Sequence, residues 1–236
     1  MPTAFERPRL LPTTAQDESF AGVTYHLDGE LVPVLTIELP AGSPMIYFEH
    51  HIVLWKHPQV TISVRPMKGA LRRMMAGMQI LVTEAAGPGS IAFSRDGAGH
   101  IVPIHLQRGD ELHVREHQFL AATANVEYTF ERVKGAANML FGGTGFFIDK
   151  FHCQAGDGIL WLHGYGNVFE KTLAAGETLD VEPGGWVYKT ATMSMETKLT
   201  RLSTGMLAGV NLLLNRFTGP GRIGIQSMYM HYPTEA

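Results

Sequence analysis

Short runs of alternating apolar and polar residues, bounded by glycine, aspartate and proline, follow one another along most of the chain. A period of two is typical of β-strands that bury one face. In residues 25–39 two such runs flank Asp28-Gly29, which predicts a strand, a hairpin turn and a second strand. The corresponding stretches, 91–106 and 159–173, predict the same arrangement. The pattern therefore predicts an all-β fold.

The runs recur at a fixed spacing, which indicates an internal repeat. The turn glycines Gly42, Gly109 and Gly176 are 67 residues apart, and a leucine stands three residues before each. Apolar residues follow each glycine at matching offsets, among them Ile52, Phe119 and Trp186 ten residues later. We therefore predict a triplicated unit of about 67 residues.

Two further blocks keep the same order in each copy. One places glycines at 77, 143 and 209, each 66 residues after the last, behind an apolar pair. In its first copy, LRRMMAG (71–77) lacks alternation and predicts a single helical turn ended by glycine. The other block places glycines at 87, 156 and 219, and we attribute its uneven spacing to a short insertion around residues 152–154.

The repeat predicts one domain over residues 23–230, with units at about 25–91, 92–158 and 159–225. Residues 1–22 are expected to form a loosely ordered lead-in, and 231–236 a tail. A unit of this size buries little surface alone, so the three should pack as one body around a pseudo-threefold axis. We expect the last strand, 222–228, to return beside the first unit and close the ring, which would cover an exposed edge.

Three motifs resemble a known family. FGGTGFFIDKF (141–151), AGETLDVEPGGWVY (175–188) and AGVNLLLNRFTGPGRIGIQS (208–227) are similar to the signatures of the mitochondrial-biogenesis, or "altered inheritance of mitochondria", family, of which this chain looks like a bacterial-type member. The resemblance covers about residues 23–230. It implies a β fold of the double-stranded β-helix class that includes the tryptophan-RNA attenuation (TRAP-like) proteins. It implies no catalytic residues.

Composition excludes several classes of protein. A net charge of −3 is a poor footprint for nucleic-acid binding, which usually needs a basic face. The single cysteine, Cys153, excludes an internal disulfide and a multi-cysteine zinc site, and fits a reducing compartment. No stretch approaches the roughly 20 apolar residues of a spanning helix, and the N-terminal residues lack a secretory apolar core. We expect a cytoplasmic protein without a cofactor.

The most promising polar cluster is Glu49-His50-His51, with Glu116-His117 at the same repeat position. If the predicted axis brought them together, His50, His117, Glu49 and Glu116 could hold a divalent metal. Neighbouring strand residues face opposite sides, so His50 and His51 would not both reach one ion, and a His-x-His pair is absent. The alternative interpretation is a polar loop preceding a buried strand.

Other residues offer weaker candidates. Asp149, His152 and Cys153 place a thiol near histidine, but adjacent positions alone do not make a nucleophile pair, and a variable loop is the alternative. The glycines at 142, 143 and 145 lack the strand–loop–helix setting and downstream Lys-Ser/Thr of a phosphate loop.

A basic segment suggests a surface role. Lys68, Arg72 and Arg73 stand among methionines and could contact an anionic membrane or a partner, although Met at these offsets also suits a core. The sequence as a whole favours a non-enzymatic β protein that serves binding, scaffolding or assembly, through an unknown protein partner or self-association. A metal-dependent enzyme using the Glu-His positions and a peripheral membrane organiser remain the alternatives.

Overall fold

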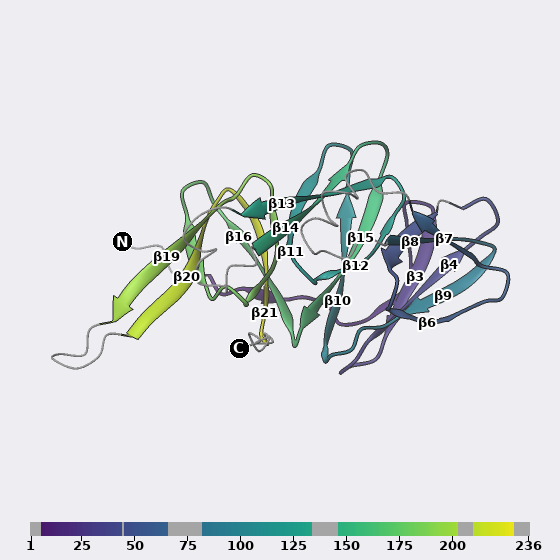
Figure 1. Ribbon diagram of the computed structural model, residues 1–236, viewed down its shortest axis with the longest axis horizontal. Helices are drawn as coiled ribbons and strands as arrows, with labels where there is room; N and C mark the ends of the chain where they lie inside the picture. Colours follow the sequence, from purple (N-terminus) through teal and green to yellow (C-terminus); the bar gives the residue numbers. More distant parts are fainter. Residues whose placement is uncertain (1–5, 44, 66–81, 134–145, 203–209, 229–236) are drawn as a thin grey trace.

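The protein is built of β-strands. The computed structural model describes residues 6–43, 45–65, 82–133, 146–202 and 210–228. All the secondary-structure elements in these ranges are β-strands (Figure 1). Burial alternates as the sequence predicts: in β3 (Val23–Asp28) the side chains of Val23, Tyr25 and Leu27 are buried, and those between them are more exposed. The all-β prediction is confirmed. The described ranges include no helix long and apolar enough to cross a bilayer.

Two further strands precede the main body, β1 (Arg9–Leu10) and β2 (Ala15–Phe20). After β3, eighteen strands follow in three runs of six, which we name the first, second and third lobes. The first lobe comprises β4 (Val34–Leu39), β5 (Ile46–Glu49), β6 (Val53–Lys56), β7 (Thr61–Arg65), β8 (Val82–Ala86) and β9 (Gly89–Phe93). The second comprises β10 (Gly99–Leu106), β11 (Glu111–Arg115), β12 (Phe119–Thr123), β13 (Val126–Val133), β14 (Phe146–Cys153) and β15 (Gly158–Tyr165). The third comprises β16 (Val168–Leu173), β17 (Thr178–Val181), β18 (Trp186–Thr190), β19 (Ser194–Leu202), β20 (Val210–Thr218) and β21 (Gly221–Gln226).

The strands of each lobe pair in the same way. The first strand of a lobe pairs with the sixth, and the sixth also pairs with the third. The second pairs with the fifth, which also pairs with the fourth. All these pairings are antiparallel. Each lobe therefore contributes two three-stranded groups, in the orders first–sixth–third and second–fifth–fourth.

Neighbouring lobes share sheets. β12 of the second lobe pairs with β5 of the first, which makes one six-stranded sheet in the order β10-β15-β12-β5-β8-β7. β18 of the third lobe pairs likewise with β11 of the second, within a seven-stranded sheet that β1 extends. The first lobe ends in a five-stranded sheet, β2-β3-β4-β9-β6, and the third in a three-stranded sheet, β17-β20-β19. In Figure 1 the lobes follow one another along the longest axis, from β6 and β9 at one end to the β19–β20 hairpin at the other.

The hydrophobic core forms three clusters that cross the lobe boundaries. The first gathers the inner residues of the first lobe with Trp161 and Leu120 from the second. The second joins residues of the second lobe with Tyr47 from the first and Tyr188 from the third. The third joins residues of the third lobe around Trp186 with Ile148 from the second. Because side chains of adjacent lobes fill common clusters, the lobes are packed against each other by the same apolar burial that stabilises each of them.

Several predicted details are wrong. The strand at the end of the chain, β21, lies between β16 and β18 of its own lobe and does not return beside the first lobe. The hairpin predicted in 25–39 is present as the β3–β4 pair. The hairpins predicted within 91–106 and within 159–173 are not formed, because β9 does not pair with β10, and β15 does not pair with β16. In both stretches the chain leaves one lobe for the next. Residues 152 and 153 end β14 and do not form an inserted loop. The helical turn predicted for 71–77, with the equivalent blocks around Gly143 and Gly209, lies outside the described ranges.

The alignment of the first copy is out by one residue. β12 places Thr123 opposite Ile46, and β18 places Thr190 opposite Leu112, so Ile46 corresponds to Leu112. Ile46 comes four residues after its turn glycine, whereas Leu112 comes three after Gly109. The three turn glycines are alike: all have positive φ, 75° at Gly42, and leave open space where a Cβ would lie. Since the turns correspond, the extra residue of the first copy falls between its turn glycine and its second strand.

Candidate functional site

The Glu-His segments form the turns that connect the second and third strands of the first two lobes. Each turn is closed by a backbone hydrogen bond over three residues: the amide of Ile52 donates to the Glu49 carbonyl at 3.4 Å, and that of Gln118 to the Arg115 carbonyl at 3.2 Å. Glu49 therefore corresponds to Arg115. It follows that His117 is the counterpart of His51 and not of His50, contrary to the alignment made from the sequence.

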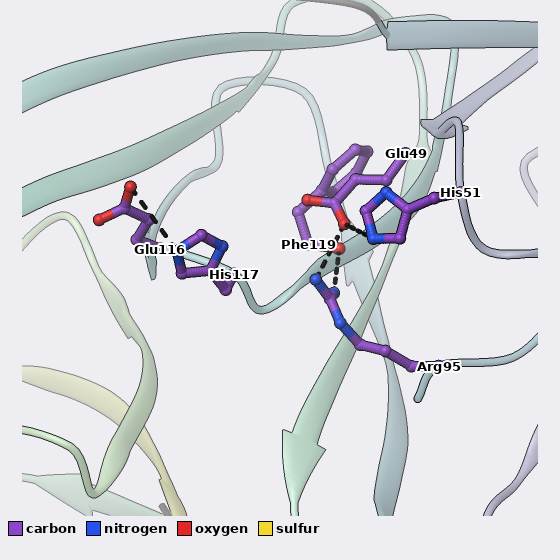
Figure 2. Close-up of polar contacts among 6 residues, drawn as sticks. All are labelled: Glu49, His51, Arg95, Glu116, His117 and Phe119. Carbon is purple, nitrogen blue, oxygen red and sulfur yellow. Dashed lines mark hydrogen bonds and ion pairs between the residues drawn. The ribbon is translucent and has the colours of Figure 1, made fainter. Parts of the chain in front are cut away.

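The two turns lie near each other, with a buried arginine between the lobes (Figure 2). Arg95 follows β9 of the first lobe, and only 5% of its side chain is exposed. Its Nη2 donates to Glu49 Oε2 at 2.9 Å, and its Nη1 donates to the carbonyl oxygen of Phe119 at 2.8 Å. Since Glu49 belongs to the first lobe and Phe119 to the second, one guanidinium binds both. Nothing in the sequence marked Arg95, because a single arginine in a turn carries no periodic or motif signal.

The histidines lie at the rim of this arrangement. His51 Nε2 is 3.6 Å from Glu49 Oε2, and His117 Nε2 is 3.8 Å from Glu116 Oε1. His50 is exposed and its ring stands edge-on to that of His51, with 5.3 Å between the centroids. Partial burial is the main cause of a lowered pKa at His117, and the positive charges of Arg95 and Arg115 lower that pKa further. His117 therefore favours its neutral form.

The predicted metal set is not assembled as expected. Within the ranges that the structure describes, no group of three or more His, Cys, Asp or Glu side chains is placed to hold a metal ion. Glu49 is bound to the Arg95 guanidinium and lies beside His51, which was not one of the four predicted ligands, whereas Glu116 lies beside His117. A fixed positive charge beside Glu49 also opposes a divalent cation there.

The cysteine is a core residue. Cys153 is buried, lies at the end of β14 and donates from Sγ to the Gly156 carbonyl at 3.5 Å. Burial raises the pKa of its thiol, which opposes thiolate formation. Asp149 accepts a hydrogen bond from the Tyr128 hydroxyl at 2.7 Å. Neither side chain shows an interaction with His152 that would activate a nucleophile. Lys68, Arg72 and Arg73 lie outside the described ranges.

A cleft that the sequence did not indicate lies between the N-terminal strands and the second and third lobes. It has a volume of about 320 Å³, at the low end for small-molecule sites. Its polar lining includes Arg9, His105, Glu170 and Arg222. The Tyr188 hydroxyl donates to Glu170 Oε2 at 2.5 Å, and Arg222 Nη1 lies 3.3 Å from the same oxygen. These five residues come from five different strands, so no local motif could have shown them together.

A sequence model of the family described as mitochondrial biogenesis AIM24 matches residues 25–228. The chain belongs to the AIM24 family. The match covers all three lobes and confirms the resemblance that the motifs suggested.

A crystal structure of protein SPYM3_0169 from Streptococcus pyogenes is similar to the AIM24-family chain over 88% of this chain and 94% of that one, with a TM-score of 0.66 and 21% sequence identity. At that identity the likeness supports the fold alone. No curated protein matches the chain.

Proposed function

We propose that this protein is a non-enzymatic scaffold, a rigid row of β lobes that serves binding or assembly. The observation that carries the proposal is the position of Arg95. The charged groups with the best claim to acid–base or metal chemistry lie at a lobe junction, and the strongest interactions among them join one lobe to the next. The Glu49 carboxylate, bound to the buried Arg95 guanidinium, therefore helps to hold the first lobe against the second.

The pairing pattern supports a row of equivalent units. Three successive runs of six strands pair alike, and each junction uses the third strand of one lobe and the second strand of the lobe before it. We infer that the lobes are three copies of one unit. The nested order, first–sixth–third against second–fifth–fourth, favours a small double-stranded β-helix as that unit.

Metal analysis tests the proposal against the metal-dependent alternative. Untagged protein purified without chelators is measured by mass spectrometry, beside His51→Ala and His117→Ala. The scaffold requires no stoichiometric metal in any of the three. His50→Ala is the matched control, because His50 is exposed and does not occupy the position equivalent to His117. A stoichiometric metal that both His51→Ala and His117→Ala remove, and that His50→Ala leaves in place, would refute the scaffold and favour an enzyme.

A further inference from the structure

The outer edge of the first strand is covered in two lobes and open in one. β4 of the first lobe pairs on that edge with β3, and β16 of the third lobe pairs there with β1. Both covering strands run antiparallel to the strand that they cover. Among the described strands, β10 of the second lobe pairs with β15 alone and ends its sheet. Its outer edge is therefore available where the edges of its counterparts are occupied.

The cleft described above lies at this open edge. Leu106 and Leu173 are equivalent, because each lies opposite the glycine that begins the sixth strand of its lobe. Three residues before them stand Pro103 and Glu170, which are therefore equivalent as well. Glu170 lies opposite Arg9 of β1, whereas Pro103 lines the cleft. The cleft thus takes the place that a covering strand has in the third lobe.

β10 presents its edge, and not a face, to the cleft. Four consecutive residues, 102–105, line the cleft, whereas a strand face would contribute only alternate residues. In the third lobe the amide of Leu11 donates to the Val168 carbonyl at 2.9 Å, so the backbone groups of Val168 and of Glu170, two residues on, point outward. The equivalent Pro103 carbonyl therefore points toward the cleft. Proline suits such a position, because it has no amide hydrogen to leave without a partner.

β10 runs from the third lobe toward the first. Near its start, Nδ1 of His100 accepts a hydrogen bond from the Val168 amide of the third lobe at 3.1 Å. Near its end, Nε2 of His105 lies 3.4 Å from the hydroxyl of Tyr25, which belongs to the sheet of the first lobe. A strand that covered β10 in the antiparallel direction of β3 and β1 would therefore begin at the first lobe and end at the third.

The cleft carries opposite charges toward these two lobes. On the side of the third lobe it is lined by Arg9, whose guanidinium has no hydrogen bond or ion pair among the residues that the structure describes. Arg222, on the same side, is already paired with Glu170. On the side of the first lobe the lining includes Glu18, which accepts a hydrogen bond from the Tyr25 hydroxyl and pairs with no cation of the described ranges. A free cationic group thus stands at one side of the cleft and a free anionic group at the other.

We propose that the cleft binds a short peptide with free termini, which adds to β10 as an antiparallel strand. In this direction the ammonium group of the peptide meets Glu18 and its carboxylate meets Arg9, so strand direction and charge agree. Main-chain hydrogen bonds to the strand edge supply affinity in binding of this kind. The volume of about 320 Å³ limits the ligand to a few residues.

Calorimetry of the full chain with the tripeptide Ala-Val-Ala tests the site. Wild type should bind the free tripeptide, and acetylation of its N-terminus or amidation of its C-terminus should each weaken binding about tenfold, because each removes a charge-assisted contact. Methylation of the central amide nitrogen, which removes the N–H that would donate to the Pro103 carbonyl, should also weaken binding. A wild type that does not bind the free tripeptide at millimolar concentration, or that binds all four forms equally, would overturn the proposal.

Two variants connect the peptide termini with their binding residues. Arg9→Gln should weaken binding of the free tripeptide about tenfold and leave binding of the amidated form unchanged, because both changes remove the same contact. Glu18→Gln should have the corresponding effects on the free and acetylated forms. Arg7→Gln is the matched control, since Arg7 is exposed on the same segment but does not line the cleft, and it should bind like wild type. Equal losses in Arg7→Gln and Arg9→Gln would overturn the proposal.

The peptide site goes beyond the scaffold role and does not depend on it. Arg95 does not line the cleft, and the metal analysis above involves none of the residues that bind the peptide. Absence of peptide binding in a protein that also holds no metal would therefore remove the peptide site and leave the scaffold in place.

Discussion

Replacement of Arg95 by alanine removes the side chain that binds two lobes at once. The change leaves the Phe119 carbonyl and the Glu49 carboxylate without their cationic donor. Breaking a buried ion pair from one side costs about 3–5 kcal/mol, and because a quarter of the Glu49 side chain is exposed we take the lower end, about 3 kcal/mol. For a chain of this length that loss lowers Tm by about 6–12 °C.

Urea unfolding of wild type and Arg95→Ala measures this loss directly. The matched control is Arg216→Ala, which removes an arginine that also binds a carboxylate, Asp180, through two hydrogen bonds but is 43% exposed. A surface pair of that kind contributes about 0–1 kcal/mol. A double-mutant cycle with Glu49→Ala then isolates the pair. Equal losses for Arg95→Ala and Arg216→Ala would refute the argument that Arg95 ties the lobes together.

Three further predictions concern single buried groups. Burial lowers the pKa of His163 to about 4, from about 6.5 in the unfolded chain. The free energy of unfolding is therefore at its full value above pH 6.5 and falls by about 3 kcal/mol as the pH drops to 4, because the unfolded chain binds the proton more tightly. His163→Gln should remove this dependence, so its free energy of unfolding should stay flat between pH 6.5 and 4. Gly224→Ala would place a Cβ 2.3 Å from the buried Tyr188 ring and should lower the free energy of unfolding in urea by about 2 kcal/mol. Gly176→Ala is the control, because Gly176 has positive φ but open space around it, and should lower the same free energy by only about 1 kcal/mol. A larger loss for Gly176→Ala than for Gly224→Ala would contradict the packing argument. Cys153 should stay unreactive toward a chromogenic disulfide reagent until the protein is denatured, and rapid labelling of the native state would show that its burial is wrong.

The sequence predicted the class of the fold because alternation and turn glycines are local signals. Gly42, Gly109 and Gly176 all occupy turns with positive φ, as their residue type suggested. The slip of one residue in the first copy arose because Ile46, Tyr47 and Phe48 are all buried, so this run has no alternation to fix its register.

The contents of the candidate site could not be predicted in the same way. Arg95 stands 46 residues after Glu49, and its other acceptor is a backbone carbonyl, which every residue has. The cleft at Tyr188 and Glu170 depends on which strands become neighbours. The repeat alone did not determine the neighbours, since β21 was predicted to lie beside the first lobe and instead pairs with β16. The common threefold axis and the double-stranded β-helix stay predictions, and the pairing order within each lobe bears only on the second of them.

The pairing of first and sixth strands bears on how the chain is made. Leu39 pairs with Gly89, Leu106 with Gly158 and Leu173 with Gly221, so each lobe closes a loop of about 50 residues before its first and sixth strands can pair. Contacts so distant in sequence slow folding, and the chain emerges from the ribosome at about 5–20 residues per second. One edge of β5 pairs with β8 of its own lobe, but its other edge stays open for longer, since its partner there, β12, ends at Thr123. A nascent chain therefore carries unpaired edges for several seconds, during which a chaperone has time to bind.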